Sequence, residues 1–182
     1  MTTLDRRRRK SQKAIIQAFL QLLLEKNVSD ITINEIAAKA DVSRGTVYAN
    51  FSDKYDLLDR CIEVKVNELF SYCMNLHQDA ALLSKEILVD SFAYLAENAE
   101  VFKALFNENG NGQFKKHFLR HSVATLRQEK VFTERFDATS EIAAQFYAAA
   151  ITGVIEWWIV QDMPCSEEDV VTGLWQLIEH NM

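Results

Sequence analysis

Residues that interrupt or cross-link a fold are scarce in this sequence. Its 182 residues include one proline, five glycines and three cysteines. So few helix breakers favour an all-helical chain. The cysteines are an odd number and lie far apart, at Cys61, Cys73 and Cys165. This usage indicates reduced thiols and a cytoplasmic location.

Long apolar runs and catalytic patterns are also missing. No run approaches about 18 apolar residues, so we expect no membrane span and no membrane partner. The charged N-terminus lacks the apolar segment of a signal peptide. Neither paired carboxylates, a nucleophile elbow nor a phosphate-binding loop is recognisable, so the sequence predicts no enzyme and no cofactor.

Charge is divided unevenly along the chain. Residues 1–55 carry a net charge of +4, whereas residues 56–182 carry −10. A basic N-terminal part on an acidic remainder is typical of a protein whose head alone meets nucleic acid. The run Arg6-Arg7-Arg8-Arg9-Lys10 is the densest basic feature. It is either a solvated, frayed terminus or an arm that contacts DNA phosphates or the minor groove.

The segment 32–58 has the pattern of a helix-turn-helix. Thr32 and Glu35 form a capping-box pattern, so a helix is expected from Ile33. Asp41, which tolerates a left-handed backbone, falls where that helix must stop. Ser43 can cap the next helix, on which Val47 and Phe51 form a buried apolar face opposite the polar residues. This spacing presents the second helix to a DNA major groove.

The polar residues of this segment are the candidate DNA contacts. On the second helix, Arg44 can bind guanine through two hydrogen bonds, and Asn50 can reach a base edge or a phosphate. We expect Ser43, Gly45 and Lys54 to hold the phosphate backbone. The full predicted set is Thr32, Asn34, Ser43, Arg44, Gly45, Thr46, Tyr48, Asn50 and Lys54. The alternative for each residue alone is a solvated surface group, but the set taken together favours DNA contact.

The same residues resemble the DNA-binding domain of the TetR family of transcriptional regulators over about residues 9–58. The resemblance rests on Thr32, Ile36-Ala37, Ala40-Asp41-Val42-Ser43-Arg44-Gly45-Thr46-Val47-Tyr48, Phe51, Lys54 and Leu57-Leu58. Asp41 departs from the family's usual glycine, and Tyr55 from a common acidic residue. The resemblance implies a DNA-binding dimer that recognises a palindromic operator.

A coarse pass along the chain predicts about nine helices and two domains, 1–58 and 59–182. Two helices are those of the helix-turn-helix, and the others cover about 5–26, 53–77, 84–97, 99–107, 113–129, 138–161 and 167–180. The stretch 107–112, rich in asparagine and glycine, is the clearest loop in the second domain. The first domain is expected to bind DNA, and the second to bind a ligand and to dimerise.

The last two predicted helices are strongly apolar, and the first of them has several small residues. They either complete the core of one protomer or form a homodimer interface, and the resemblance favours the interface. The residues predicted there are Ala149, Gly153, Trp157, Val171, Leu174, Trp175 and Ile178.

Aromatic residues of the second domain are candidates for a ligand pocket, although each can also be a plain core residue. The predicted pocket comprises Phe102, Phe106, Phe118, His121, Phe146, Tyr147 and Trp157.

His117 and His121 lie four apart on one helix face, but no acid or cysteine nearby completes a metal site, so no metal is predicted. Cys61 and Cys73 are either oxidant sensors or buried thiols.

Two functions are therefore kept open. The first is a dimeric repressor that a small molecule releases from its operator. The second follows from a weaker resemblance of Phe102–Phe106, the loop and Gly153–Pro164 to the dihydroxyacetone-kinase-regulator (DhaS-like) branch. That branch implies a regulator or coactivator controlled by a partner protein.

Overall fold

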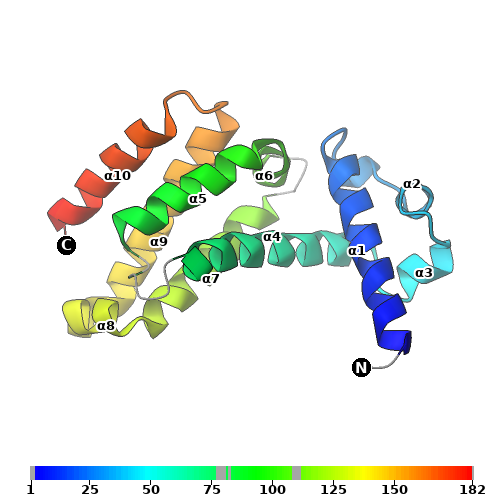
Figure 1. Cartoon of the computed structure of the whole chain (residues 1–182), viewed down its shortest axis with the longest axis horizontal. Coiled ribbons are helices and arrows are strands. Elements are labelled where there is room, and N and C mark those ends of the chain that lie inside the picture. The colour runs from blue at the N-terminus through cyan, green and yellow to red at the C-terminus, as the bar shows by residue number, and fades with distance from the viewer. Residues whose placement is uncertain (1–2, 77–80, 82, 108–111, 182) are drawn as a thin grey trace. The chain divides into compact units, whose positions relative to one another are not determined.

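The computed structural model describes residues 3–76, 81, 83–107 and 112–181. Every regular element within these ranges is a helix, as predicted (Figure 1). The chain divides into two compact units, one of Met1–Val64 with Ala104–Phe114 and one of Lys65–Lys103 with Lys115–Met182. Most of the predicted loop 107–112 lies outside the described residues.

The first unit contains α1 (Thr3–Leu23), the short 3-10 helix η1 (Val28–Asp30), α2 (Ile33–Lys39) and α3 (Arg44–Tyr48). The start of α4 (Lys54–Leu76) and the segment Ala104–Phe114 complete it. Helix α2 packs against both α1 and α3. The unit's fully buried side chains include Ile15, Phe19, Leu23, Ile31, Ile36, Val47, Leu57 and Leu58. Burying each such side chain contributes roughly 1.5–3 kcal/mol to folding, and this small core fixes how α3 is presented.

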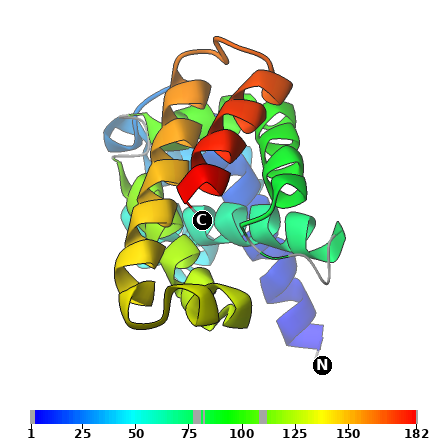
Figure 2. The same ribbon diagram turned by 90° about the vertical axis from the view of Figure 1, so that its left-hand side faces the viewer.

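The second unit is built around α9 (Ser140–Val160). The other helices are α5 (Lys85–Glu97), α6 (Ala99–Phe106), α7 (Gln113–Gln128), α8 (Lys130–Phe136), the 3-10 helix η3 (Asp137–Thr139) and α10 (Glu167–Asn181). Helices α5, α9 and α10 pack against one another, and both views show them side by side (Figures 1 and 2). The small side chains Ala143, Ala144 and Ala148 are buried on α9, which lets neighbouring helices approach closely.

Helix α8 is the α-helix that the sequence pattern did not predict. Its N-cap residue, Glu129, makes no side-chain cap bond, and its C-cap residue, Asp137, has a φ of +39°. Aromatic packing holds it in place: the Phe132 ring lies 4.8 Å from Phe136 and 6.2 Å from Tyr147, centroid to centroid. Tertiary contacts therefore stabilise a helix too short to form alone.

The turn between α9 and α10 is held by several hydrogen bonds. Asp162 and Met163 both adopt positive φ, and the Met163 N–H donates to the Trp158 carbonyl at 2.7 Å. The Trp158 Nε1–H donates to the Cys165 carbonyl at 2.9 Å. Ser166 caps α10, as predicted, by accepting the Asp169 N–H at 3.1 Å.

The stretch Phe132–Val160 is long and apolar enough to cross a membrane, with a mean hydropathy of 1.3. Length and composition are weak evidence, since core helices of soluble proteins pass the same test. Here α9, the main part of this stretch, packs against α5, α8 and α10.

Candidate nucleic-acid interface and internal cavity

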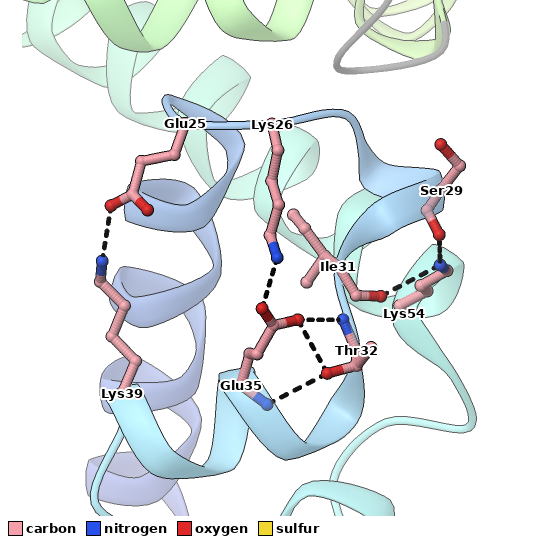
Figure 3. Close-up of polar contacts among 8 residues, drawn as sticks. All are labelled: Glu25, Lys26, Ser29, Ile31, Thr32, Glu35, Lys39 and Lys54. Atoms are coloured by element: carbon pink, nitrogen blue, oxygen red, sulfur yellow. Dashed lines mark hydrogen bonds and ion pairs between the residues drawn. The ribbon is translucent and has the colours of Figure 1, made fainter.

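Helix α2 starts in a capping box, which confirms that part of the sequence analysis. The Thr32 hydroxyl accepts the Glu35 N–H at 3.3 Å, and a Glu35 carboxylate oxygen accepts the Thr32 N–H at 2.9 Å. The Thr32 hydroxyl also donates to this carboxylate at 2.8 Å. Lys26, in the turn after α1, binds the other carboxylate oxygen (Figure 3). Thr32 thus has an intramolecular task, which is to fix the start of α2.

The Glu35 carboxyl is strongly perturbed by these contacts. Its pKa falls from about 4.5 to about 2, first through the hydrogen bond from Lys26 and then through those from Thr32. A carboxyl whose pKa is lower in the folded state stabilises the fold above its unfolded pKa, and this contribution disappears as pH falls through the folded value.

We therefore expect the stability contributed by Glu35 to be complete above about pH 4.5 and to be lost between about pH 4.5 and 2. Glu35→Gln should lower stability at neutral pH and flatten this part of the pH profile. Urea unfolding of both proteins across this range measures the difference. Parallel profiles would contradict the assignment.

The turn after α2 uses a left-handed residue. Asp41 has φ +53°, and the Val42 N–H donates to the Ala37 carbonyl at 3.0 Å. The Asp41 N–H bonds to the Ala38 carbonyl at 3.3 Å. This is a Schellman motif, with aspartate in the place that glycine usually fills. The predicted left-handed role of Asp41 is confirmed.

Helix α3 is amphipathic over a very short length. Ser43 caps it by accepting the Thr46 N–H at 3.1 Å, as predicted. Val47 and Phe51 are buried against the unit's core, whereas Arg44, Gly45 and Tyr48 are exposed. A Cβ atom added at Gly45 would meet only the Ser43 hydroxyl, at 3.7 Å. Nothing inside the protomer requires glycine at this position, so an external molecule can approach the backbone here.

Two predicted DNA contacts have intramolecular partners that the sequence did not reveal. Lys54 donates to the carbonyls of Ser29 and Ile31, the latter at 3.0 Å (Figure 3). These bonds explain a cation at the N-terminus of α4, and the phosphate contact of Lys54 stays a prediction. Asn50 donates to the Thr46 carbonyl at 2.8 Å and accepts from Arg8 at 3.4 Å. Its carboxamide therefore joins α3 to the basic run of α1.

The basic run is helical in the structure. Arg6, Arg7, Arg8, Arg9 and Lys10 all lie within α1 and are exposed. A helical run places these charges on the sides of one helix rather than along an extended arm. Asn34, on α2, is also exposed. The DNA contacts of all these residues remain predictions.

The second unit contains a small cavity that is partly open to the surface. Its volume is about 50 Å³, and its lining comes from α4, α5, α7, α9 and Leu83, which precedes α5. We call it the internal cavity; its lining residues are Phe70, Leu83, Ile87, Leu88, Ser91, Phe118, Ser122, Leu126, Ala148, Ile151 and Ile155. Of the seven predicted pocket residues, Phe118 alone is among them.

The other predicted pocket residues lie elsewhere. Phe146 and Trp157 are exposed on the side of α9 away from Ala148 and Ile155, because positions two apart on a helix lie about 200° apart. Phe102, Phe106 and Tyr147 are buried but do not line the cavity. His121 stacks on Phe70, with ring centroids 4.2 Å apart, and so stands behind a cavity wall.

The predicted dimer residues divide into two groups. Val171, Leu174 and Ile178 of α10 are buried within the protomer, and their place in an interface stays a prediction. Their side chains belong to the core, where α10 packs against α5 and α9. Ala149 and Trp157 are exposed, and Gly153 and Trp175 are partly exposed.

The exposed apolar side chains of α9 form one stripe. It comprises Ile142, Phe146, Ala149, Gly153 and Trp157, which we call the α9 stripe. The spacing of three or four residues keeps all five on one helix face. A Cβ atom at Gly153 would meet nothing within 4 Å, so the centre of the stripe is open to close approach.

The histidines and cysteines singled out in the sequence form no metal or redox site in the described part of the chain. No group of three or more His, Cys, Asp or Glu side chains there is placed to hold a metal ion. His117 instead shares a hydrogen bond with Arg120 at 2.9 Å. Cys61 and Cys73 are buried, and burial raises the pKa of the Cys73 thiol, which disfavours the reactive thiolate.

Two family models match the chain. One describes bacterial regulatory proteins of the tetR family and matches residues 15–61. The other describes a transcriptional regulator C-terminal region and matches residues 84–180. The first covers the helix-turn-helix, and the second covers most of the second unit.

Curated relatives include two bacterial regulators. The uncharacterized HTH-type transcriptional regulator YxbF of Bacillus subtilis (strain 168) is 25% identical over 174 residues, 92% of this chain and 44% of the relative. The HTH-type transcriptional repressor BepR of Brucella suis biovar 1 (strain 1330) is 40% identical over 52 residues, 29% of this chain and 25% of the relative. The chain thus spans less than half the length of these relatives.

Solved structures share the fold over nearly the whole chain. A TetR transcriptional regulator from Streptococcus agalactiae 2603V aligns with TM-score 0.70 and 23% identity, covering 96% of each chain. The dihydroxyacetone kinase operon activator DhaS gives 0.67 and 22%, covering 94% of this chain and 95% of the other. NalD of Pseudomonas aeruginosa, the secondary repressor of the MexAB-OprM multidrug efflux pump, gives 0.66 and 21%, covering 95% and 96%. At these identities the likeness concerns the fold alone.

Proposed function

Because the chain belongs to the TetR family of DNA-binding transcriptional regulators, we propose that it is a dimeric repressor that a small molecule releases from its operator. Regulators of this family bind DNA and typically act as dimers, and the family is not an enzyme family. The repressors BepR and NalD among its relatives support repression. We propose residues 1–58 as the DNA-binding domain, residues 59–182 as the ligand and dimer domain, and the cytoplasm as the location.

The exposed face of α3 is the observation that carries the proposal. Arg44 projects from the first turn of the helix and Tyr48 from the next, with Gly45 between them. In a major groove, Arg44 would bind a guanine, and Tyr48 would donate its hydroxyl to a phosphate. Ser43 and Thr46 would add contacts to the DNA phosphate backbone beside Gly45, where no side chain blocks its approach. Thr32 and Asn50 would chiefly hold α2, α3 and the basic run in register.

A second copy of the chain would cover the α9 stripe. Four exposed apolar side chains and the partly exposed Gly153 on one helix face form an unusual surface for an isolated protomer. Across a two-fold axis, the stripe would meet the same stripe of the partner, with Gly153 allowing close approach. Two α3 helices would then read half-sites about 34–36 Å apart.

Release would follow from a difference in affinity between two conformations. In one conformation of the dimer the spacing of the two DNA-binding domains matches the half-sites, and in the other it does not. A ligand that binds the second unit more tightly in the mismatched conformation would shift the population away from the DNA-bound form. The internal cavity is the candidate ligand site, because it lies between four helices of that unit.

The DhaS-like alternative, control through a partner protein, receives no separate support. DhaS shares the fold, but so do several other regulators at similar TM-scores. The fold likeness therefore does not single out that branch.

Sequencing of genomic fragments captured by the purified protein at near-physiological salt tests the proposal. A palindromic site is the expected result, and the neighbouring genes would point to the ligand. Recovery of sequence-independent, salt-sensitive DNA only would overturn the repressor and favour control by a protein partner.

On the captured site, Arg44→Ala should weaken binding by about 1–3 kcal/mol, since a bidentate contact to guanine is lost. This loss of binding free energy should occur only on DNA that contains the base pair contacted by Arg44, and not on DNA in which that base pair has been replaced. Arg60→Ala is the matched control, because Arg60 carries the same charge on α4 and pairs with Glu63 at 2.7 Å. Fluorescence anisotropy measures both. Equal losses for the two variants would show that Arg44 supplies charge and no base recognition.

A further inference from the structure

The wall of the internal cavity is almost entirely apolar. Nine of its eleven lining residues are aliphatic or aromatic, and none of the eleven carries a charge. The polar exceptions are Ser91 on α5 and Ser122 on α7. An ionised ligand placed among these side chains would lose its hydration without gaining a counter-charge from the wall.

Both serine hydroxyls have their hydrogens committed. Ser122 donates to the Phe118 carbonyl at 2.9 Å, and Ser91 donates to the Ile87 carbonyl at 2.7 Å. The Cys73 thiol, 3.2 Å from the Ser91 oxygen, must then be the donor in that pair. A hydroxyl oxygen can accept two hydrogen bonds, so Ser122 keeps both acceptor positions and Ser91 keeps one. The cavity therefore presents acceptors and no donor from these two side chains.

Two titratable groups beside the wall, Cys73 and His121, are neutral. Burial raises the pKa of the Cys73 thiol and lowers the pKa of His121, which stacks on Phe70. Neither group supplies a charge near pH 7, so neither provides a counter-ion for an acid or an amine.

From this arrangement we propose that the effector is an uncharged, mainly apolar molecule with a hydrogen-bond donor, such as an alcohol or a phenol. The inference rests on the proposed function only in naming this molecule as the effector; the binding chemistry stands on the cavity itself. At about 50 Å³ the cavity is far smaller than the roughly 300–1,000 Å³ of typical ligand pockets, so it must widen when it binds a molecule of six carbons.

Four six-carbon probes separate charge from hydrogen bonding: 1-hexanol, its isomer 1-methoxypentane, hexanoate and hexylammonium. Titration of the whole protein at pH 7, followed by methyl resonances of Ile87, Ile151 and Leu126, measures their binding. We expect hexanol to bind best and the ether several-fold less tightly, since it has no donor. Hexanoate and hexylammonium should bind at least about tenfold more weakly than hexanol, because their charges would be buried unpaired.

Two variants place the probe in the cavity. Ser122→Ala should reduce the preference for hexanol over the ether, since it removes two acceptor positions and keeps the space. Ala148→Leu should abolish binding by filling the cavity, because Ala148 is buried in its wall. Ala124→Leu, an exposed change of the same size on α7, should have no effect. If Ala148→Leu does not fold, the Ser122→Ala comparison still decides.

Several outcomes would overturn the proposed ligand class: equal binding of hexanol and either ion, no shift with any probe, or an unchanged hexanol preference in Ser122→Ala. Operator binding is measured separately, at saturating hexanol. The expected probe order with unchanged operator occupancy would leave the ligand class standing and reject release by such ligands. Failure to recover an operator at all would reject the proposed repressor, whatever the probes do.

Discussion

We expect Trp158→Ala to lower the free energy of unfolding by about 3–5 kcal/mol, the range for truncating a buried tryptophan. Trp158 is 1% exposed and is the largest of the fully buried side chains. Its ring meets Phe92 of α5 edge to face, with centroids 5.2 Å apart. Its Nε1–H also satisfies the Cys165 carbonyl in the turn before α10. The substitution would thus open a cavity where α9, α5 and the turn meet.

The neighbouring Trp157 provides a matched control. It is 49% exposed, so Trp157→Ala removes the same atoms without leaving an internal cavity. We expect its effect on unfolding to be below about 1 kcal/mol once dimerisation is taken into account, as for surface changes. Urea unfolding at several protein concentrations separates the two contributions. Equal, concentration-independent losses for both variants would show that the division of α9 into a buried and an exposed face is wrong.

The helix-turn-helix was predictable because its signals are local. The capping box of Thr32 and Glu35, the left-handed Asp41 and the Ser43 cap each act within a few residues of the chain. Sequence spacing therefore determines them, and the structure confirms all three. Sequence spacing could not reveal the contacts that these side chains make with residues of other elements. One example is the ion pair between Glu35 and Lys26, which lies in the turn after α1.

The roles of longer-range residues depend on tertiary packing. Lys54 bonds to carbonyls 23 and 25 residues away, and this separation carries no pattern in the sequence. On α10, Val171, Leu174 and Ile178 were assigned to an interface although they fill the protomer core. An apolar helix face has the same periodicity whether it meets a neighbouring helix or another subunit. For the same reason only Phe118 of the predicted pocket residues lines the internal cavity, since aromatic residues lie on both faces of α9.

The α9 stripe leads to the second large expected effect: Phe146→Asp should dissociate the dimer. Phe146 is 59% exposed in the protomer, near the middle of a row with Ile142 on one side and Ala149 on the other. In a two-fold interface the substitution occurs twice, and each carboxylate would be buried without a partner. An uncompensated buried charge costs about 3–5 kcal/mol, so the dimer dissociation constant should rise by at least about 100-fold.

Analytical ultracentrifugation measures this shift, and operator binding should weaken with it, because a single α3 reads only one half-site. Val89→Asp is the control, since Val89 is also an exposed apolar residue but lies on α5, outside the stripe. It should leave the dimer intact. The protomer fold should survive in both variants, because neither side chain contributes to the buried core. A Phe146→Asp protein that stays dimeric and binds its operator normally would place the interface elsewhere and leave the α9 stripe free for a different partner.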